Sequence, residues 1–187
     1  MHRLKSITNS RKYMTDMENN RMSTPWNAIA FFENLTKTNK LAVSKKFVFV
    51  QISGLHGLEE AVAQMQNVPN FVMVNENAVG ATDLDNSPHT RSVRTVFFAM
   101  RHVQGDMKSR AKCMETMREL HRQFLSKIMM EKTRLAENMQ YLVPRITLQE
   151  VDQYLIPGTA MCMFEIAVDT YIDLSYNADE WITVPSN

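Results

Sequence analysis

The most regular hydrophobic pattern in the chain is an alternation near its C-terminus. From residue 160 to residue 174 the even-numbered positions are mostly apolar, whereas the odd-numbered positions carry most of the polar side chains. A period of two is typical of a half-buried strand, so we predict a strand of about fifteen residues whose even face packs into the core. That even face consists of Ala160, Cys162, Phe164, Ile166, Val168, Thr170, Ile172 and Leu174.

Shorter apolar runs predict further strands. Residues 47–52 (FVFVQI), 71–74 (FVMV) and 145–151 (RITLQEV) have β-rich composition and are bounded by Gly, Pro or polar residues. Residues 77–90 are dense in turn formers and predict a long loop.

Residues 92–103 predict a strand that is apolar on both faces. Phe97 points to one face, and Phe98 and Met100 point to the other. A strand of this kind must be covered on both sides. We therefore expect a helix on one face and a further element or a neighbouring subunit on the other.

A long helix is predicted over residues 106–138, because apolar side chains recur there every seven residues. At 1.5 Å per residue it would be about 50 Å long, and we expect a break near Met129. The repeating positions are Met107, Met114, His121, Ile128 and Leu135.

Two shorter helices complete the predicted elements. One begins with Thr24 as N-cap and Pro25 at the first helical position, and the other covers residues 57–67. Residues 23–187 are thus predicted to form one α+β domain, preceded by a polar N-terminal arm over residues 1–22. We expect a single antiparallel or mixed β-sheet of about four to five strands, packed against one long and one or two shorter helices.

Composition is that of a globular protein, with 44% hydrophobic and 22% charged residues among 187. No apolar run approaches the ~20 residues that cross a bilayer, so no membrane association is expected.

The net charge is only +1, but it is unevenly spread. Residues 1–46 hold nine Lys and Arg against three acids, and residues 139–187 hold one against seven. The two ends could meet within one fold, or could offer opposite charges to neighbouring copies.

The acidic segment DTYIDLSYNADEW (residues 169–181) is the first candidate for chemistry. Asp169 and Asp173 lie on one face of the predicted strand about 13 Å apart, too far for a pair of cooperating carboxylates. Asn177 and Glu180 have the spacing of a helix cap. A structural role is therefore expected for this segment, with no metal or cofactor site.

Two other chemical readings remain open. Cys113 and Cys162 are expected to be core thiols, and an enzyme that uses either of them ranks last. His121 lies on the apolar helix stripe and is expected to be a core histidine.

The helix over 106–138 carries eight Lys and Arg against five acids, so the alternative function is a nucleic-acid-binding module that uses its basic face.

The chain ends in a motif that follows the alternating strand and consists of Asp173, Leu174, Tyr176, Asn177, Asp179 and Trp181. With the order of elements, this ending resembles that of small tail-terminator or tail-completion (head–tail junction) proteins of tailed bacteriophages, most closely those of phages of Bacteroidetes hosts.

This resemblance implies a structural virion protein, not an enzyme, that is assembled in the host bacterial cytoplasm. Such subunits form a ring, commonly a hexamer, that completes the tail tube and joins it to a neck or connector protein. DNA would pass through the lumen without sequence-specific readout. The expected interface residues are Phe97, Phe98, Met100, Asp169, Tyr171, Asp173, Tyr176 and Trp181.

Overall fold

The computed structural model describes residues 26–54, 57, 68, 70–77, 79–85, 87–151 and 158–182. The polar arm, the helix start at Thr24 and Pro25, and the helix over 57–67 except Gly57 lie outside these ranges.

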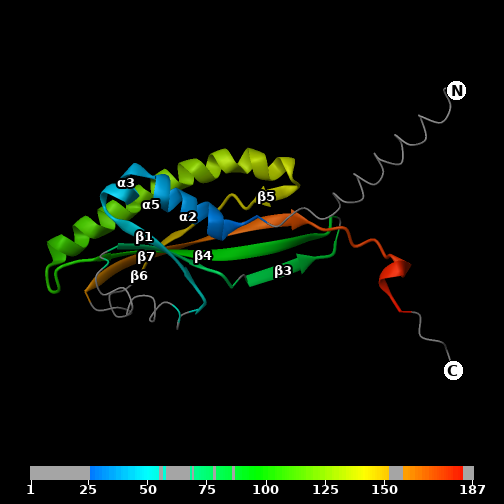
Figure 1. The fold of residues 1–187 in the computed structure, drawn as a ribbon, viewed down its shortest axis with the longest axis horizontal. Helices are drawn as coiled ribbons and strands as arrows, with labels where there is room; N and C mark the ends of the chain where they lie inside the picture. The colour runs from blue at the N-terminus through cyan, green and yellow to red at the C-terminus, as the bar shows by residue number, and fades with distance from the viewer. Residues whose placement is uncertain are drawn as a thin grey trace.

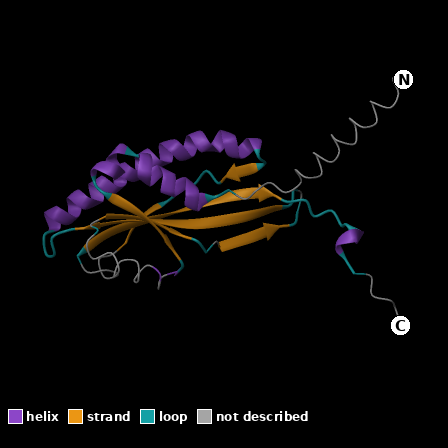
Figure 2. Ribbon diagram, in the orientation of Figure 1, coloured by secondary structure: helices purple, strands orange, loops and turns teal. Residues whose placement is uncertain are grey.

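The described elements form a mixed β-sheet with helices on one of its faces (Figures 1 and 2). In chain order they are α2 (Ala28–Thr38), α3 (Lys40–Ser44), β1 (Phe47–Ile52), β2 (Asn70–Asn75), β3 (Val79–Asp83), β4 (His89–Arg101), α5 (Met107–Glu137), β5 (Gln140–Leu142), β6 (Leu148–Val151), β7 (Thr159–Tyr171) and the 3-10 helix η1 (Ala178–Glu180).

The sheet is built around the two long antiparallel strands β4 and β7, with strand order β1-β2-β4-β7-β5. β2 and β3 pair with successive halves of one edge of β4, and β6 and β5 do the same along β7. Only β1 and β2 run parallel. Seven described strands therefore fill five positions across the sheet. The α+β class and a mixed sheet are confirmed, but the expected count of four to five strands is too low.

The loop predicted over residues 77–90 is wrong in part, because it contains β3 and the start of β4. All five residues of β3 are exposed, so neither face of this strand carries a hydrophobic period. β4 begins at His89, three residues before the predicted strand.

The main core lies between the sheet and the helices α2 and α5. Phe98 of β4 and Phe164 of β7 are fully buried, with ring centroids 5.6 Å apart. Phe124 of α5 packs edge-on against Phe98 at 5.4 Å, and Phe32 of α2 lies 5.9 Å from Phe164. This confirms the predicted even face of β7 as far as Val168. The strand ends at Tyr171, shorter than predicted.

The helices begin at side-chain caps. In α5, Asp106 accepts hydrogen bonds from the N–H groups of Lys108 and Ser109, and the helix then runs without the break expected near Met129. In α2 the N-cap is Asn27, whose side chain accepts from Ala30 N at 2.9 Å, so Thr24 is not the start of this helix. Among the described helices, none has the length and apolar character that crossing a bilayer requires.

Candidate interaction surfaces

The predicted interface residues of β4 lie in the interior of the chain. Phe98 and Met100 belong to the core between sheet and helices, and Phe97 belongs to a smaller core on the opposite face, with Phe71 and Met73. Both faces of the strand are apolar, as predicted, but both are buried within one copy. In the folded chain these three side chains are therefore core residues and present no surface to a neighbour.

Asp169 lies on the face of β7 that points away from the helices, as predicted, and is held by Arg91. The Arg91 guanidinium donates from Nε to Oδ1 at 2.7 Å and from Nη2 to Oδ2 at 2.8 Å. Hydrogen bonding from Arg91 lowers the pKa of Asp169 against the opposing effect of partial burial. Arg91 is directly opposite Asp169 in the β4–β7 register but 78 residues earlier in the chain, so no local sequence pattern indicates this partner.

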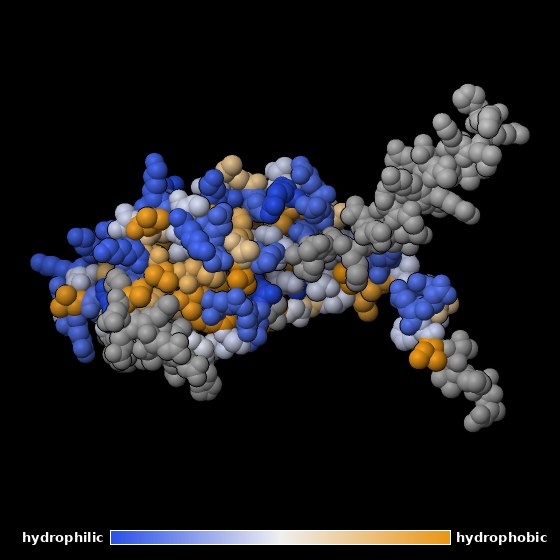
Figure 3. All heavy atoms as spheres, in the orientation of Figure 1, coloured by the Kyte–Doolittle hydropathy of each residue, from blue (hydrophilic) through white to orange (hydrophobic). Residues whose placement is uncertain are grey.

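Beyond Tyr171, residues 172–182 leave the sheet; we call them the C-terminal arm. Ile172 N still donates to Pro88 O of the body at 3.0 Å. From Ser175 to Trp181 the hydrogen bonds shown for the described residues are local to the arm. Figures 1 and 3 show the arm standing clear of the domain.

The arm has a defined local structure. Asn177 caps η1 by accepting from Asp179 N at 3.1 Å, and its Nδ2 donates to Glu180 Oε1 at 3.4 Å, which confirms the predicted cap. Tyr176 stacks on Trp181 with ring centroids 6.3 Å apart. Tyr176 is 77% exposed, Trp181 66% and Ile182 93%. The arm thus presents large apolar side chains, together with exposed Asp179 and Glu180, to solvent.

The acidic C-terminal region does not pair with the basic N-terminal region in the part of the chain that is described. Its ion pairs go to Arg91, from Asp169, and to Arg118 of α5, from Glu150. The exposed lysines of the basic region, including Lys40, Lys45 and Lys46, lie around α3 and the start of β1. Among the described residues, these three lysines form no ion pair and are compatible with a contact between copies.

The basic character of α5 is partly neutralised. Arg118 donates from Nε to Glu150 at 2.9 Å, Arg122 pairs with Glu119, and Arg134 pairs with Glu131. Hydrogen bonding from Arg122 lowers the pKa of Glu119 to about 2, so this carboxylate stays charged beside its partner. Three of the eight cations counted on this helix are thus already paired with acids, which weakens the alternative of a nucleic-acid-binding face.

Both thiols lie in the core. Burial raises the pKa of Cys162 to about 12, and burial also raises the pKa of Cys113, although the charges of Lys45 and Lys112 oppose the change. Each thiol is therefore protonated at neutral pH, and a protonated thiol is a poor nucleophile.

His121 is a core histidine, as predicted, with its ring 4.8 Å from that of Phe164. Burial lowers the pKa of His121, and its Nε2 is buried with no hydrogen-bond partner.

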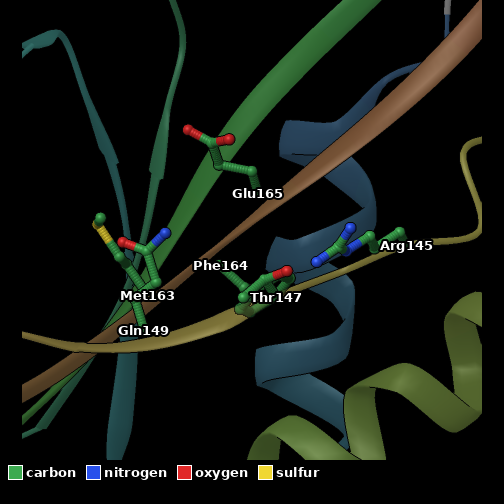
Figure 4. A pocket seen from close by; sticks show the side chains of 6 residues that line it. All are labelled: Arg145, Thr147, Gln149, Met163, Phe164 and Glu165. Atoms are coloured by element: carbon green, nitrogen blue, oxygen red, sulfur yellow. The ribbon is translucent and has the colours of Figure 1, made fainter.

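A pocket of about 210 Å³ opens beside β6 and β7. Figure 4 shows its lining side chains, and its charged ones are Arg145, on the segment that leads to β6, and Glu165 of β7. No pattern in the sequence indicated this pocket. Within the described ranges no three His, Cys, Asp or Glu residues gather as metal ligands would.

The sequence matches no protein-family model and no curated protein. The resemblance to tail-terminator proteins remains an expectation that rests on the C-terminal motif and the order of elements.

Proposed function

We propose that this protein is a structural virion subunit that assembles with its own copies into a ring, a hexamer by the family resemblance. The ring would lie at the end of a phage tail tube or at the head–tail junction. There it would complete the tail, join it to a neck or connector protein and let DNA pass. Its binding partners are thus other copies of itself, the tube protein and the neck protein.

The observation that carries this proposal is the C-terminal arm. Three of the motif residues behind the resemblance, Tyr176, Asn177 and Trp181, form a stacked and capped unit instead of joining the core. Fully burying a large apolar side chain is worth about 1.5–3 kcal/mol, and Trp and Tyr are enriched at the centres of protein interfaces. A preformed apolar unit held outside the domain is well suited to packing against another molecule.

The exposed strand β3 supports the same proposal. Among the described strands it pairs only with β4, so its outer edge keeps free backbone donors and acceptors. Its side chains are exposed along the whole strand, including the apolar Val79. An edge of this kind is a ready template for a strand of another subunit.

Light scattering coupled to size exclusion, followed by negative-stain imaging of the full chain, tests the proposal. The expected result is one discrete oligomer with a central opening. A species that remains monomeric up to the highest soluble concentration, alone and with tail tube protein, would overturn it.

A further inference from the structure

We propose that the C-terminal arm of one copy binds the lysine-rich end of the domain of the next copy. This inference rests on the proposed self-assembly and identifies the two surfaces that make the contact.

The donor surface is the arm itself. Residues 172–182 contain three acids (Asp173, Asp179 and Glu180) and no Lys or Arg. Asp179 and Glu180 lie in η1, beside the stacked rings of Tyr176 and Trp181. An acceptor for the arm therefore needs positive charge next to apolar surface.

The acceptor surface, which we call the cationic end, lies where α3, the start of β1 and the first turns of α5 come together. Asn70 pairs with Met100 of β4, and its Nδ2 donates to Lys45 O at 2.5 Å. Cys113, the neighbour of Lys112 in α5, donates from Sγ to the carbonyl oxygen of Arg101 at 3.6 Å. Both segments therefore meet the same end of β4. All lysines of the cationic end are exposed, and none forms an ion pair with a described acid. They are Lys40, Lys45, Lys46, Lys108 and Lys112.

Apolar side chains accompany these lysines. Val43 of α3, Val103 in the turn after β4 and Met107 at the start of α5 are all exposed. The cationic end thus offers both features that the arm requires: positive charge, and apolar contacts for Tyr176 and Trp181.

The geometry separates the two surfaces within one copy. The arm leaves β7 at Tyr171, which pairs with His89 at the first residue of β4. The cationic end lies at the other end of β4, because Phe47 pairs with Asn70 and Asn70 with Met100. The twelve steps from His89 to Arg101 span about 40 Å at 3.3 Å per residue.

The arm cannot bridge that distance within its own copy. Its eleven residues would reach about 36–40 Å only if fully extended, and the turn of η1 shortens them. The acceptor must therefore belong to a second copy. Each copy then uses a different surface toward each neighbour, a heterologous contact that closes into a ring or continues as a filament.

Charge reversal with compensation tests the contact. Asp179→Lys with Glu180→Lys reverses the two charges of η1, and Lys45→Glu with Lys112→Glu reverses the two lysines that face them in the proposed contact. We expect either pair alone to weaken assembly at least about tenfold in dissociation constant, and all four together to restore most of it, as complementary charges at an interface require. Assembly is measured by sedimentation velocity of the full chain at low and high salt.

A matched control makes the same change in net charge elsewhere. Glu137→Lys with Glu165→Lys alters two exposed carboxylates outside the arm and should leave assembly at the wild-type level. Because all of these positions are exposed, every variant should retain the wild-type melting curve, which circular dichroism checks.

The remaining outcomes decide between the proposals. If the wild type forms rings and the reversals leave them unchanged, the arm contact is refuted while the proposed function stands. A wild type that never associates refutes both. If Lys45→Glu with Lys112→Glu abolishes salt-sensitive DNA binding and leaves assembly unchanged, the cationic end binds nucleic acid. The contact between copies is then refuted.

Discussion

Arg91 and Asp169 face each other across β4 and β7 and are joined by two hydrogen bonds, at 2.7 and 2.8 Å. The pair lies on the sheet face opposite α5. It fixes the carboxylate, which the sequence suggested as a contact residue, within the sheet of its own copy. Asp169 therefore acts first as a cross-strand link, close to where the C-terminal arm begins.

Removing this carboxylate should cost little stability. Because the pair is partly exposed, we expect Asp169→Asn to lower the free energy of unfolding by about 0.5–1 kcal/mol at pH 7. The pKa of Asp169 is lowered in the fold, so the contribution is present above the unfolded pKa and is lost as pH falls through the folded value. Urea unfolding at pH 7 and pH 3 measures this difference. The fold should survive even with Asp173→Asn added, and a loss above about 3 kcal/mol would contradict the assignment.

The register of β7 makes a sharper prediction. Phe164 is 1% exposed and packs against Phe32, Phe98 and His121, so Phe164→Asp places an unpaired charge in the core and should prevent folding. The milder Phe164→Ala should cost about 3–5 kcal/mol. Its exposed neighbour provides the control, since Glu165→Ala should stay within about 0.5 kcal/mol of wild type. A cooperative melt of Phe164→Asp at the wild-type temperature would refute the register.

His121 should make stability depend on pH. Because burial lowers its pKa in the fold, the unfolded chain binds a proton more readily. Stability should therefore fall as pH drops below the unfolded value of about 6.5, by at most ~1.4 kcal/mol per pH unit from this group. His121→Leu removes the ring with its unpartnered Nε2 and should flatten the difference between pH 7.5 and pH 5.5. Equal slopes for the variant and the wild type would show that other groups are responsible.

The two cysteines should be inert in the folded chain. With both thiols buried and the pKa of Cys162 raised to about 12, alkylation by iodoacetamide at pH 8 should be much slower than in denaturant. Mass spectrometry of timed samples counts the modified thiols. Rapid labelling of either cysteine in the native protein would instead indicate an activated nucleophile, and would revive the reading of the chain as an enzyme.

The elements that could be predicted are those in which burial follows a clear period. β7 alternates because its even face meets the helices, and α5 repeats every seven residues because one stripe meets the sheet. β3 could not be found, since all of its residues are exposed and its place depends on pairing with β4. β5, three residues long, is too short to show a period.

For the candidate surfaces, composition could be predicted but location could not. The cap formed by Asn177 and Glu180 is local, so their spacing was enough to predict it. The apolar pattern of β4 predicted that other side chains pack on each of its faces. It did not indicate whether those side chains belong to the same chain or to a neighbour. The separation between the arm and the cationic end follows from the register of β1, β2, β4 and β7, which no local pattern contains.

We propose that copies of this chain form a ring at the end of a phage tail. Purified phage particles, checked by mass spectrometry for this protein and reconstructed with the symmetry of the tail, provide the decisive measurement. We expect a closed ring of this fold at the tail end or the neck, with the arm of each copy on the cationic end of the next. Particles without the protein, or with isolated copies of it away from the tail axis, would refute the proposal.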